Sequence, residues 1–308
     1  MARREFYFDS ASGRDKICAY EFTPEAEPWA VVQIVHGMAE HMGRYAPFAE
    51  YLNSRGYAVL GHDHLGHGKS APEGRLGFMA AENGWRYLVD DTERMTELIE
   101  ARYPGKPIIL FAHSTGSKIG RIYLTERGDR LAKCVLSGMT EKVKWMGISS
   151  AIIRAKRKQK GPEARDEFLQ QAAFGRHNRR IASPASPNAW LTRDEELVRE
   201  YDRDPLSGFS FTIAGFQDLM ELSKRIFARG FFEQAPKEVP VLVAVGGEDP
   251  CGGYGKGVER EVAKMRRAGM DVTLKIFPGA RHELLNEINR QEVFVALEEW
   301  MGKSLRPY

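Results

Sequence analysis

The sequence predicts an open α/β fold, in which a mostly parallel, doubly wound sheet carries an antiparallel hairpin at one edge and a helical insertion. Three observations predict this fold. The first residues alternate apolar and polar side chains, short apolar runs then alternate with helical patterns, and this alternation stops in a long central stretch before it resumes.

The amino-terminal hairpin is expected over Glu5–Asp9 and Lys16–Phe22, joined by Ser10-Ala11-Ser12-Gly13. Both segments alternate apolar and polar residues, and the connection is rich in small turn-forming residues. One face of such a hairpin is exposed to solvent, so we expect it at an edge of the sheet.

The interior strands and their helices follow in alternation. Short, nearly continuous apolar runs are typical of strands covered on both faces. They occur at Ala30–Val35, Tyr57–Leu60, Ile108–Ala112, Leu131–Leu136 and Val239–Val245. A final strand is expected at Val272–Phe277, ahead of the last helix. Helical patterns occur at Tyr45–Arg55, Trp85–Tyr103, Ser117–Arg127, Gly257–Ala268 and Glu287–Met301. This order predicts parallel strands joined by helices that cover both faces of the sheet.

The alternation stops between Met139 and Gly230, where helical stretches and a proline-rich segment at Ser183–Pro187 replace the strand pattern. We therefore expect a core formed by residues 1–138 and 231–308 and a helical lid formed by residues 139–230. The lid would leave the carboxyl end of a strand, which is the edge where open α/β sheets bind ligands.

Composition narrows the class of protein. Among 308 residues, 45 basic and 42 acidic side chains leave a net charge of +3, so no general affinity for nucleic acid is expected. Three widely spaced cysteines, Cys18, Cys134 and Cys251, argue against a disulfide framework or a zinc site. Because the sequence shows neither a signal peptide nor an apolar stretch of membrane-spanning length, we expect a cytoplasmic protein.

A serine stands at the turn between the apolar run Ile108–Phe111 and the helical pattern that follows. The segment Ala112-His113-Ser114-Thr115-Gly116 resembles the Gly-x-Ser-x-Gly elbow, in which the strained turn exposes the hydroxyl above the sheet edge. Ala112 replaces the first glycine, and its methyl group is small enough to fit with slight crowding. Ser114 is therefore predicted to be a nucleophile, although the pentapeptide alone would also suit a serine that caps a helix.

A serine nucleophile needs a histidine base and a carboxylate that orients it, and at such elbows the chain order is serine, acid, histidine. Asp249, just beyond the strand Val239–Val245, is the preferred acid, and the adjacent Glu248 is its rival. Of the eight histidines, His282 is the one that follows Asp249, and it lies in a turn between the last strand and the last helix. The predicted catalytic set is Ser114, Asp249 and His282.

Two backbone N–H groups are predicted to stabilise an oxyanion. Thr115 supplies one, because it follows the nucleophile at the start of the helix. Met38 supplies the other, because Gly37 permits a sharp turn after the strand Ala30–Val35. Local sequence does not exclude that His36-Gly37 simply ends the strand.

Several longer motifs resemble one known family. They are His36-Gly37-Met38-Ala39-Glu40-His41, then Gly43-Arg44-Tyr45, then Gly61 to Ser70 (GHDHLGHGKS), and Pro278 to Glu283 (PGARHE). Together they look like the α/β-hydrolase group that contains monoacylglycerol lipases and bacterial lysophospholipases. Within the expected lid, Trp190 to Asp194 and Tyr201 to Phe209 are similar to bacterial members. The resemblance implies the same roles for Ser114, Asp249, His282, Met38 and Thr115, and adds ester-linked monoacyl lipids as the substrate class.

Two other groups of residues suggest chemistry that we disfavour. His62, His64 and His67 with Asp63 could converge on a metal ion, but Gly66 and Gly68 indicate a turn-rich loop with a structural role. Cys251 lies close to the acid, yet Ser114 is better placed as a nucleophile. We expect Cys251 to be a small buried residue.

A basic run lies in the expected lid, where Arg154 to Lys160 (RAKRKQK) follows the apolar Trp145 to Ile153. The favoured interpretation is a solvated helix end with an apolar face over the site. The alternative is weak peripheral contact between the lid and an anionic membrane surface.

The sequence thus predicts a serine hydrolase that cleaves carboxylic esters of monoacyl lipids through an acyl-enzyme, without a cofactor or a metal. A carboxylesterase for short-chain or aromatic esters is the enzymatic alternative, since lid apolar residues would suit helix packing as well as an acyl chain. A non-catalytic binding protein on the same fold is the alternative from another class.

Overall fold

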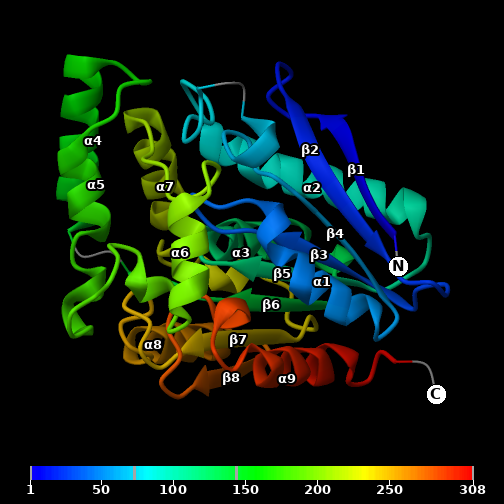
Figure 1. Cartoon of the computed structure of the whole chain (residues 1–308). Coiled ribbons are helices and arrows are strands. Elements are labelled where there is room, and N and C mark those ends of the chain that lie inside the picture. The colour runs from blue at the N-terminus through cyan, green and yellow to red at the C-terminus, as the bar shows by residue number, and fades with distance from the viewer. Residues whose placement is uncertain (1, 72–73, 143–144, 307–308) are drawn as a thin grey trace.

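An eight-stranded sheet forms the centre of the computed structural model, which describes residues 2–71, 74–142 and 145–306 (Figure 1). The strands are β1 (Ala2–Asp9), β2 (Lys16–Thr23), β3 (Ala30–Val35), β4 (Tyr57–His62), β5 (Ile108–His113), β6 (Lys133–Ser137), β7 (Val241–Gly246) and β8 (Val272–Phe277). Their order across the sheet is β1-β2-β4-β3-β5-β6-β7-β8.

The hairpin and the parallel strands are arranged as predicted. β1 pairs antiparallel with β2, and β2 pairs antiparallel with β4, whereas the remaining neighbours are parallel. β1 lies at one edge of the sheet, and most of its residues are exposed. The hairpin extends to Ala2, which pairs with Thr23, so its first strand is longer than predicted.

Helices connect the strands and fill the insertion. They are α1 (Ala46–Asn53), α2 (Gly84–Arg102), α3 (Thr115–Arg127), α4 (Met146–Lys160), α5 (Glu167–Phe174), α6 (Glu195–Arg203), α7 (Ile213–Ile226), α8 (Lys256–Arg267) and α9 (Arg290–Gly302). Short 3₁₀ turns are η1 (Met42–Tyr45), η2 (Gly68–Ser70), η3 (Gly128–Arg130), η4 (His177–Arg180), η5 (Ala189–Leu191), η6 (Phe232–Gln234) and η7 (Leu284–Asn286).

Two element boundaries differ from the prediction for clear reasons. β7 begins at Val241 because Pro240 has no N–H to donate, although its carbonyl still accepts from Cys134. The last helix begins at Arg290 because residues 287–289, which the helical pattern had included, form a turn closed by the hydrogen bond from the Arg290 N–H to the Glu287 carbonyl. Both differences lie at the ends of elements, where sequence signals are weakest.

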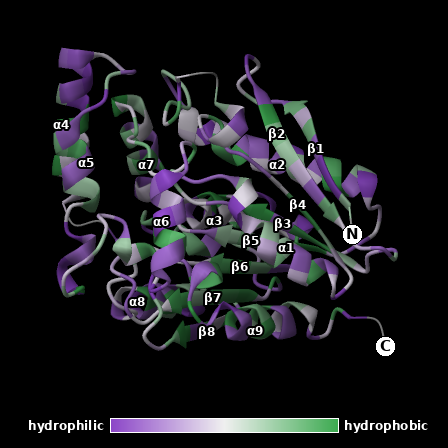
Figure 2. Ribbon diagram, viewed as in Figure 1, coloured by the Kyte–Doolittle hydropathy of each residue, from purple (hydrophilic) through white to green (hydrophobic). Residues whose placement is uncertain are grey.

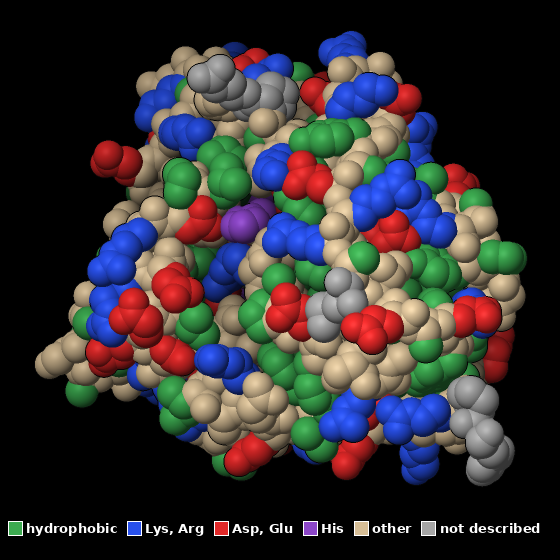
Figure 3. All heavy atoms as spheres, turned by 45° about the vertical axis from the view of Figure 1, so that its right-hand side comes forward, with side chains coloured by type: hydrophobic (Ala, Val, Ile, Leu, Met, Phe, Trp, Pro, Cys, Tyr) green, Lys and Arg blue, Asp and Glu red, His purple; other side chains and the backbone are tan. Residues whose placement is uncertain are grey.

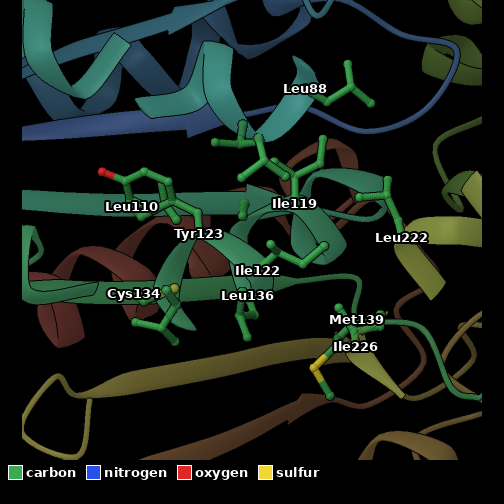
Figure 4. Packing of buried hydrophobic residues seen from close by; sticks show 14 of the residues in the cluster. Leu88, Leu110, Ile119, Ile122, Tyr123, Cys134, Leu136, Met139, Leu222 and Ile226 are labelled. Atoms are coloured by element: carbon green, nitrogen blue, oxygen red, sulfur yellow. The ribbon is translucent and has the colours of Figure 1, made fainter. Parts of the chain in front are cut away.

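The core has two layers, one on each face of the sheet. In β5, Ile109 and Phe111 pack into the cluster that α1 and α9 complete, while Leu110 and Ala112 pack into the cluster completed by α2, α3 and α8. Figure 4 shows Leu110 in the second cluster together with Ile119, Ile122 and Tyr123 of α3, and Figure 2 shows the apolar strands between partly polar helices. The predicted doubly wound α/β class is therefore confirmed.

Helices α4 to α7 lie between β6 and β7 in the chain, within residues 139–230. Figure 1 shows them beyond the carboxyl ends of the parallel strands, and α7 packs against α2, α3 and α4. Side chains cap three of these helices, since Asp166 accepts an N–H bond at the start of α5, Asp194 accepts two at the start of α6 and Thr212 accepts one at the start of α7.

The surface carries charges of both signs. On the face seen in Figure 3, basic and acidic side chains are intermingled, as the nearly balanced composition implies. Within the described ranges 2–71, 74–142 and 145–306, no helix combines the length and apolar character that crossing a membrane requires.

Candidate active site

Ser114 occupies a strained turn between β5 and α3. Its backbone angles are φ 53° and ψ −116°, which side-chain-bearing residues rarely adopt and which typify a nucleophile elbow. Gly116 allows this turn, since a Cβ there would collide with the carbonyl oxygens of Val35 and His36. The sheet and the helix therefore meet at the serine with little space between their backbones.

Ala112 fits the elbow because Gly120 lies opposite it. A Cβ built on Gly120 would stand 2.7 Å from the Cβ of Ala112, well inside van der Waals contact. The methyl group of Ala112 therefore uses space that a glycine on α3 leaves open. This pairing gives a physical reason why alanine is tolerated at the first position of the motif.

The structure brings Ser114, His282 and Asp249 into one hydrogen-bonded line. The Ser114 Oγ lies 2.8 Å from Nε2 of His282, and Nδ1 of His282 lies 2.9 Å from Oδ2 of Asp249. Asp249 follows β7 and His282 follows β8, so both reach the serine from the carboxyl edge of the sheet. The side chain of Glu248, the rival acid, is exposed, whereas Asp249 is 0% and His282 is 2% exposed.

The surroundings of His282 favour its charged form. Burial alone would lower the pKa of His282, but the negative charges of the Asp249 carboxylate and of Cys251 in its thiolate form outweigh burial and raise this pKa well above its usual value. The ring also packs against those of His113 and Trp190, each with its centroid 4.9 Å away. Burial and the neighbouring His282 lower the pKa of His113 to about 3, so His113 packs as a neutral ring.

The loop after β3 lies directly against the serine. A Cβ built on Gly37 would stand 3.2 Å from the Cβ of Ser114, so the loop needs glycine to approach this closely. Met38 comes next and is half-buried, while Thr115 is the first residue of α3, where backbone N–H groups have no partner within the helix. Both predicted oxyanion donors thus belong to segments beside Ser114, and their role stays a prediction.

Comparison with known proteins identifies the family. A family described as serine aminopeptidase, S33, matches residues 26–289 of this chain. The chain belongs to this family.

Known proteins and solved structures are similar to this chain over nearly its whole length. Human monoglyceride lipase is 29% identical over 96% of this chain and 89% of its own length, and a monoacylglycerol lipase from Mycolicibacterium smegmatis is 27% identical over 92% of each chain. The crystal structure of a thermostable carboxyl esterase from Bacillus coagulans in complex with glycerol has a TM-score of 0.92 at 29% identity, covering 99% of both chains. These similarities confirm the α/β-hydrolase fold and the resemblance to monoacylglycerol lipases.

A buried ion-pair network in this S33 hydrolase was not predicted from its sequence. Arg44 lies 2.8 Å from a carboxylate oxygen of Glu40 and 2.6 Å from one of Glu283. Burial would raise the pKa of Glu283, yet Arg44 outweighs it and holds this pKa at about 2. Since Glu40 lies in the loop after β3 and Glu283 follows His282, Arg44 ties two sides of the site together. The four-residue spacing of Glu40 and Arg44 could have indicated that these two side chains pair. Glu283 is 239 residues away from Arg44, so no local pattern indicates its contact with Arg44.

The same loop is tied to the insertion. Ala39, with a positive φ of 53°, accepts hydrogen bonds through its carbonyl from the Tyr201 hydroxyl and the Gly208 N–H, both at 2.9 Å. Tyr201 belongs to α6, and its ring lies 4.8 Å from the Arg44 guanidinium. The insertion therefore contacts the segment that carries Met38.

The histidine-rich segment after β4 has structural partners. Asp63 accepts hydrogen bonds from the N–H groups of Met42 and Lys69, both at 2.8 Å. The His64 N–H donates to Nε2 of His36 at 2.9 Å, which joins the loops after β3 and β4. These contacts fit the structural role predicted for the segment.

Cys251 differs from its prediction as a buried residue, because its side chain is partly exposed. Its Sγ lies 4.0 Å from Nε2 of His177, a residue of the insertion. The backbone N–H of Cys251 donates to Oδ1 of Asp249 at 2.8 Å. His177 carries no motif signal, so the sequence alone did not indicate this contact.

Proposed function

We propose that this chain is a serine hydrolase that cleaves the carboxylic esters of monoacylglycerols through Ser114, His282 and Asp249. The observation that carries the proposal is the pair of consecutive hydrogen bonds from Ser114 through His282 to Asp249, at 2.8 and 2.9 Å. Relatives named as monoglyceride lipases support the substrate class, although the family description names a peptidase.

In the proposed reaction, Ser114 attacks the ester carbonyl while His282 takes its proton, and Asp249 stabilises the imidazolium that forms. His282 then protonates the leaving alcohol, which yields an acyl-enzyme. A water that gives its proton to His282 releases the acid. The backbone N–H groups of Met38 and Thr115 would stabilise both tetrahedral intermediates, and these steps use no cofactor.

Residues 139–230 would act as a lid over this site and provide walls for an acyl chain. Two contacts support this role, namely the Trp190 ring against His282 and the bond from Tyr201 to the Ala39 carbonyl. Aromatic side chains of the insertion suit an acyl chain, namely Phe174, Phe209, Phe211 and Phe216.

A carboxylesterase for short-chain or aromatic esters is the second candidate, because the Bacillus coagulans carboxyl esterase structure matches the chain over 99% of its length. Hydrolysis rates on monoacylglycerols and lysophospholipids of increasing acyl length separate the candidates. A lipid-directed site prefers medium or long chains. Rates that fall steadily from two carbons upward would favour the short-chain esterase instead.

Labelling with a fluorophosphonate tests the nucleophile. We expect the wild-type chain to be labelled and the folded Ser114→Ala variant to remain unlabelled, because the reagent reacts with an activated serine hydroxyl. Ser54→Ala is a suitable control, since Ser54 is exposed at the end of α1 and its hydroxyl donates locally to the Tyr51 carbonyl. A folded wild type that resists the label would favour the non-catalytic binding protein.

We further propose weak peripheral contact of the insertion with anionic membranes. Trp145, Ile148 and Phe168 are 77%, 58% and 56% exposed on or beside α4 and α5. Among the basic residues of α4, Lys156 and Lys160 pair with Asp166, so part of this charge is already compensated. Anionic vesicles should bind the chain at low salt, and binding should fall when Trp145 and Ile148 are replaced by Ser.

We also propose a cytoplasmic location. The described residues include the three cysteines of the chain, Cys18, Cys134 and Cys251, and all three are free thiols. Free thiols suit a reducing compartment.

A further inference from the structure

Asp249, Cys251 and His282 bring three different metal-binding groups together. A carboxylate oxygen, the thiol sulfur and an imidazole nitrogen all lie within 4.8 Å of one another. Asp249 and Cys251 come from the loop after β7, and His282 comes from the loop after β8. The proposed hydrolysis uses the side chains of Asp249 and His282 but assigns no task to the thiol.

A second imidazole approaches this group from the insertion. His177 begins η4, between α5 and α6, and its Nε2 lies 4.0 Å from Sγ of Cys251. Its Nδ1 is buried and has no hydrogen-bond partner among the described residues. The His177 ring packs against Trp190 with centroids 4.5 Å apart, so the ring is held beside the thiol.

The four groups match the ligands that zinc prefers. Zinc binds thiolate, imidazole and carboxylate groups in tetrahedral sites, with bonds near 2.0 to 2.3 Å that put neighbouring ligand atoms about 3.3 to 3.6 Å apart. The ligand atoms of Asp249, Cys251 and His282 lie within 4.8 Å of one another, so small side-chain rotations bring these three to that geometry. His177 lies outside this group of three, although its Nε2 is 4.0 Å from the Cys251 sulfur, so it must move toward the metal to become the fourth ligand. Magnesium and calcium prefer oxygen ligands, so a thiol and two imidazoles select against them.

We propose that Zn²⁺ binds to Cys251, His282 and Asp249, with His177 as a fourth ligand, and that this binding reversibly inhibits the hydrolase. Cys251 binds as a thiolate and releases its proton to solvent, so a metal–sulfur bond replaces the S–H bond. This inference goes beyond the proposed function, and its activity readout depends on that function.

The bound metal would inhibit hydrolysis because it coordinates a ring nitrogen of His282. If the metal takes Nδ1, it displaces the proton shared with Asp249. If it takes Nε2, it removes the acceptor of the Ser114 proton. In either case His282 cannot act as the base, and the link through His177 also holds the insertion against the core.

Zinc titration of ester hydrolysis tests the proposal with matched variants. Zn²⁺ should inhibit the wild type in a buffer that does not chelate metals, and EDTA should restore activity. Cys251→Ala should raise the half-inhibiting concentration by at least about tenfold, because loss of even an outer-shell partner weakens metal sites by that factor. Cys134→Ala removes a buried thiol in β6 and should leave inhibition as in the wild type. His177→Gln should weaken inhibition to an intermediate degree.

Metal binding can be measured without catalysis. Co²⁺ added to the Ser114→Ala variant should produce a thiolate-to-cobalt charge-transfer band, and Cys251→Ala in that background should abolish the band. A wild type that is not inhibited, equal inhibition of wild type and Cys251→Ala, or a missing band would overturn the proposal. Because the cobalt experiment needs no ester hydrolysis, failure of the proposed function and failure of the metal site give different results.

Discussion

The contact between Ala112 and Gly120 makes a quantitative prediction about the elbow. In Gly120→Ala the new Cβ would lie 2.7 Å from the Cβ of Ala112 and 3.3 Å from Cδ2 of Leu110, so α3 must move away from β5 by about 1 Å to restore contact near 3.5 Å. Overpacking of this kind costs about 1 to 3 kcal/mol, and the better helix propensity of alanine recovers at most about 1 kcal/mol. Since Ser114 directly precedes α3, the shift should also lower the rate of ester hydrolysis.

A second substitution should reverse the first. Ala112→Gly alone loses one buried methyl group, at about 0.8 kcal/mol, and adds backbone freedom at roughly 0.5 to 1 kcal/mol, but it leaves the hydrolase active. In the double variant the methyl group moves from the strand to the helix, so the two losses do not add. We expect a favourable coupling free energy of about 1 to 2 kcal/mol and recovery of most of the activity.

Urea unfolding of the wild type, both single variants and the double variant measures this coupling free energy. The rate at which each protein hydrolyses one soluble ester reports whether the elbow still positions Ser114 for catalysis. Gly147→Ala on α4 is a matched control, because no atom lies within 4 Å of a Cβ built there. Strictly additive free energies of unfolding, or a double variant less active than Gly120→Ala, would refute the packing argument.

Three further predictions concern charge. Asp249→Asn should reduce kcat by roughly 10³-fold to 10⁴-fold. It should also move the acid limb of the pH–rate profile to lower pH, because the carboxylate that raises the pKa of His282 is lost. A loss of kcat below about tenfold would contradict the assignment of Asp249 as the acid of the triad. His64 and His67 should stay neutral at pH 5 in imidazole NMR spectra, because burial lowers their pKa values to about 4 and about 3. Their contribution to stability is complete above the unfolded pKa of about 6.5 and falls by about 2 kcal/mol each on going to pH 5, so a titration midpoint near 6.5 in the folded protein would contradict the argument. Arg44→Met should lower the free energy of unfolding by about 3 to 5 kcal/mol, because it leaves the buried carboxylates of Glu40 and Glu283 without their cation. An unchanged midpoint of urea unfolding would show that this ion-pair network contributes little to stability.

Periodicity predicted the core of this fold because both faces of the sheet are covered. The apolar run at Ala30–Val35 coincides with β3, all of whose residues are buried. The strand predicted at Val272–Phe277 coincides with β8, which lies at an edge of the sheet and is partly exposed. At Leu131 the apolar run began before its strand, since apolar character alone does not distinguish a turn that packs on the core from the strand that follows. The positions of Ser114 and His282 were predictable because each lies in a turn with a recognisable motif.

The sequence did not predict the contacts that join distant segments of the chain at the site. Arg44 and Glu283 stand 239 residues apart, and Cys251 and His177 stand 74 apart, in segments without a shared motif. Their proximity depends on how the insertion and the loops after β3, β7 and β8 fold onto one sheet edge. A charged or thiol side chain in one segment gives no sign of its partner in another.

The two hydrogen bonds that the Ala39 carbonyl accepts from Tyr201 and Gly208 restrict how this insertion can be exchanged. A chimaera that takes residues 139–230 from a relative inherits a different set of donors at this carbonyl. If the graft lacks both donors, the turn at Ala39 loses its outer support, and the neighbouring Met38 N–H loses its fixed direction. Transplanting substrate preference between such enzymes therefore requires keeping a hydroxyl and a backbone N–H at these two points, whatever the rest of the graft contains.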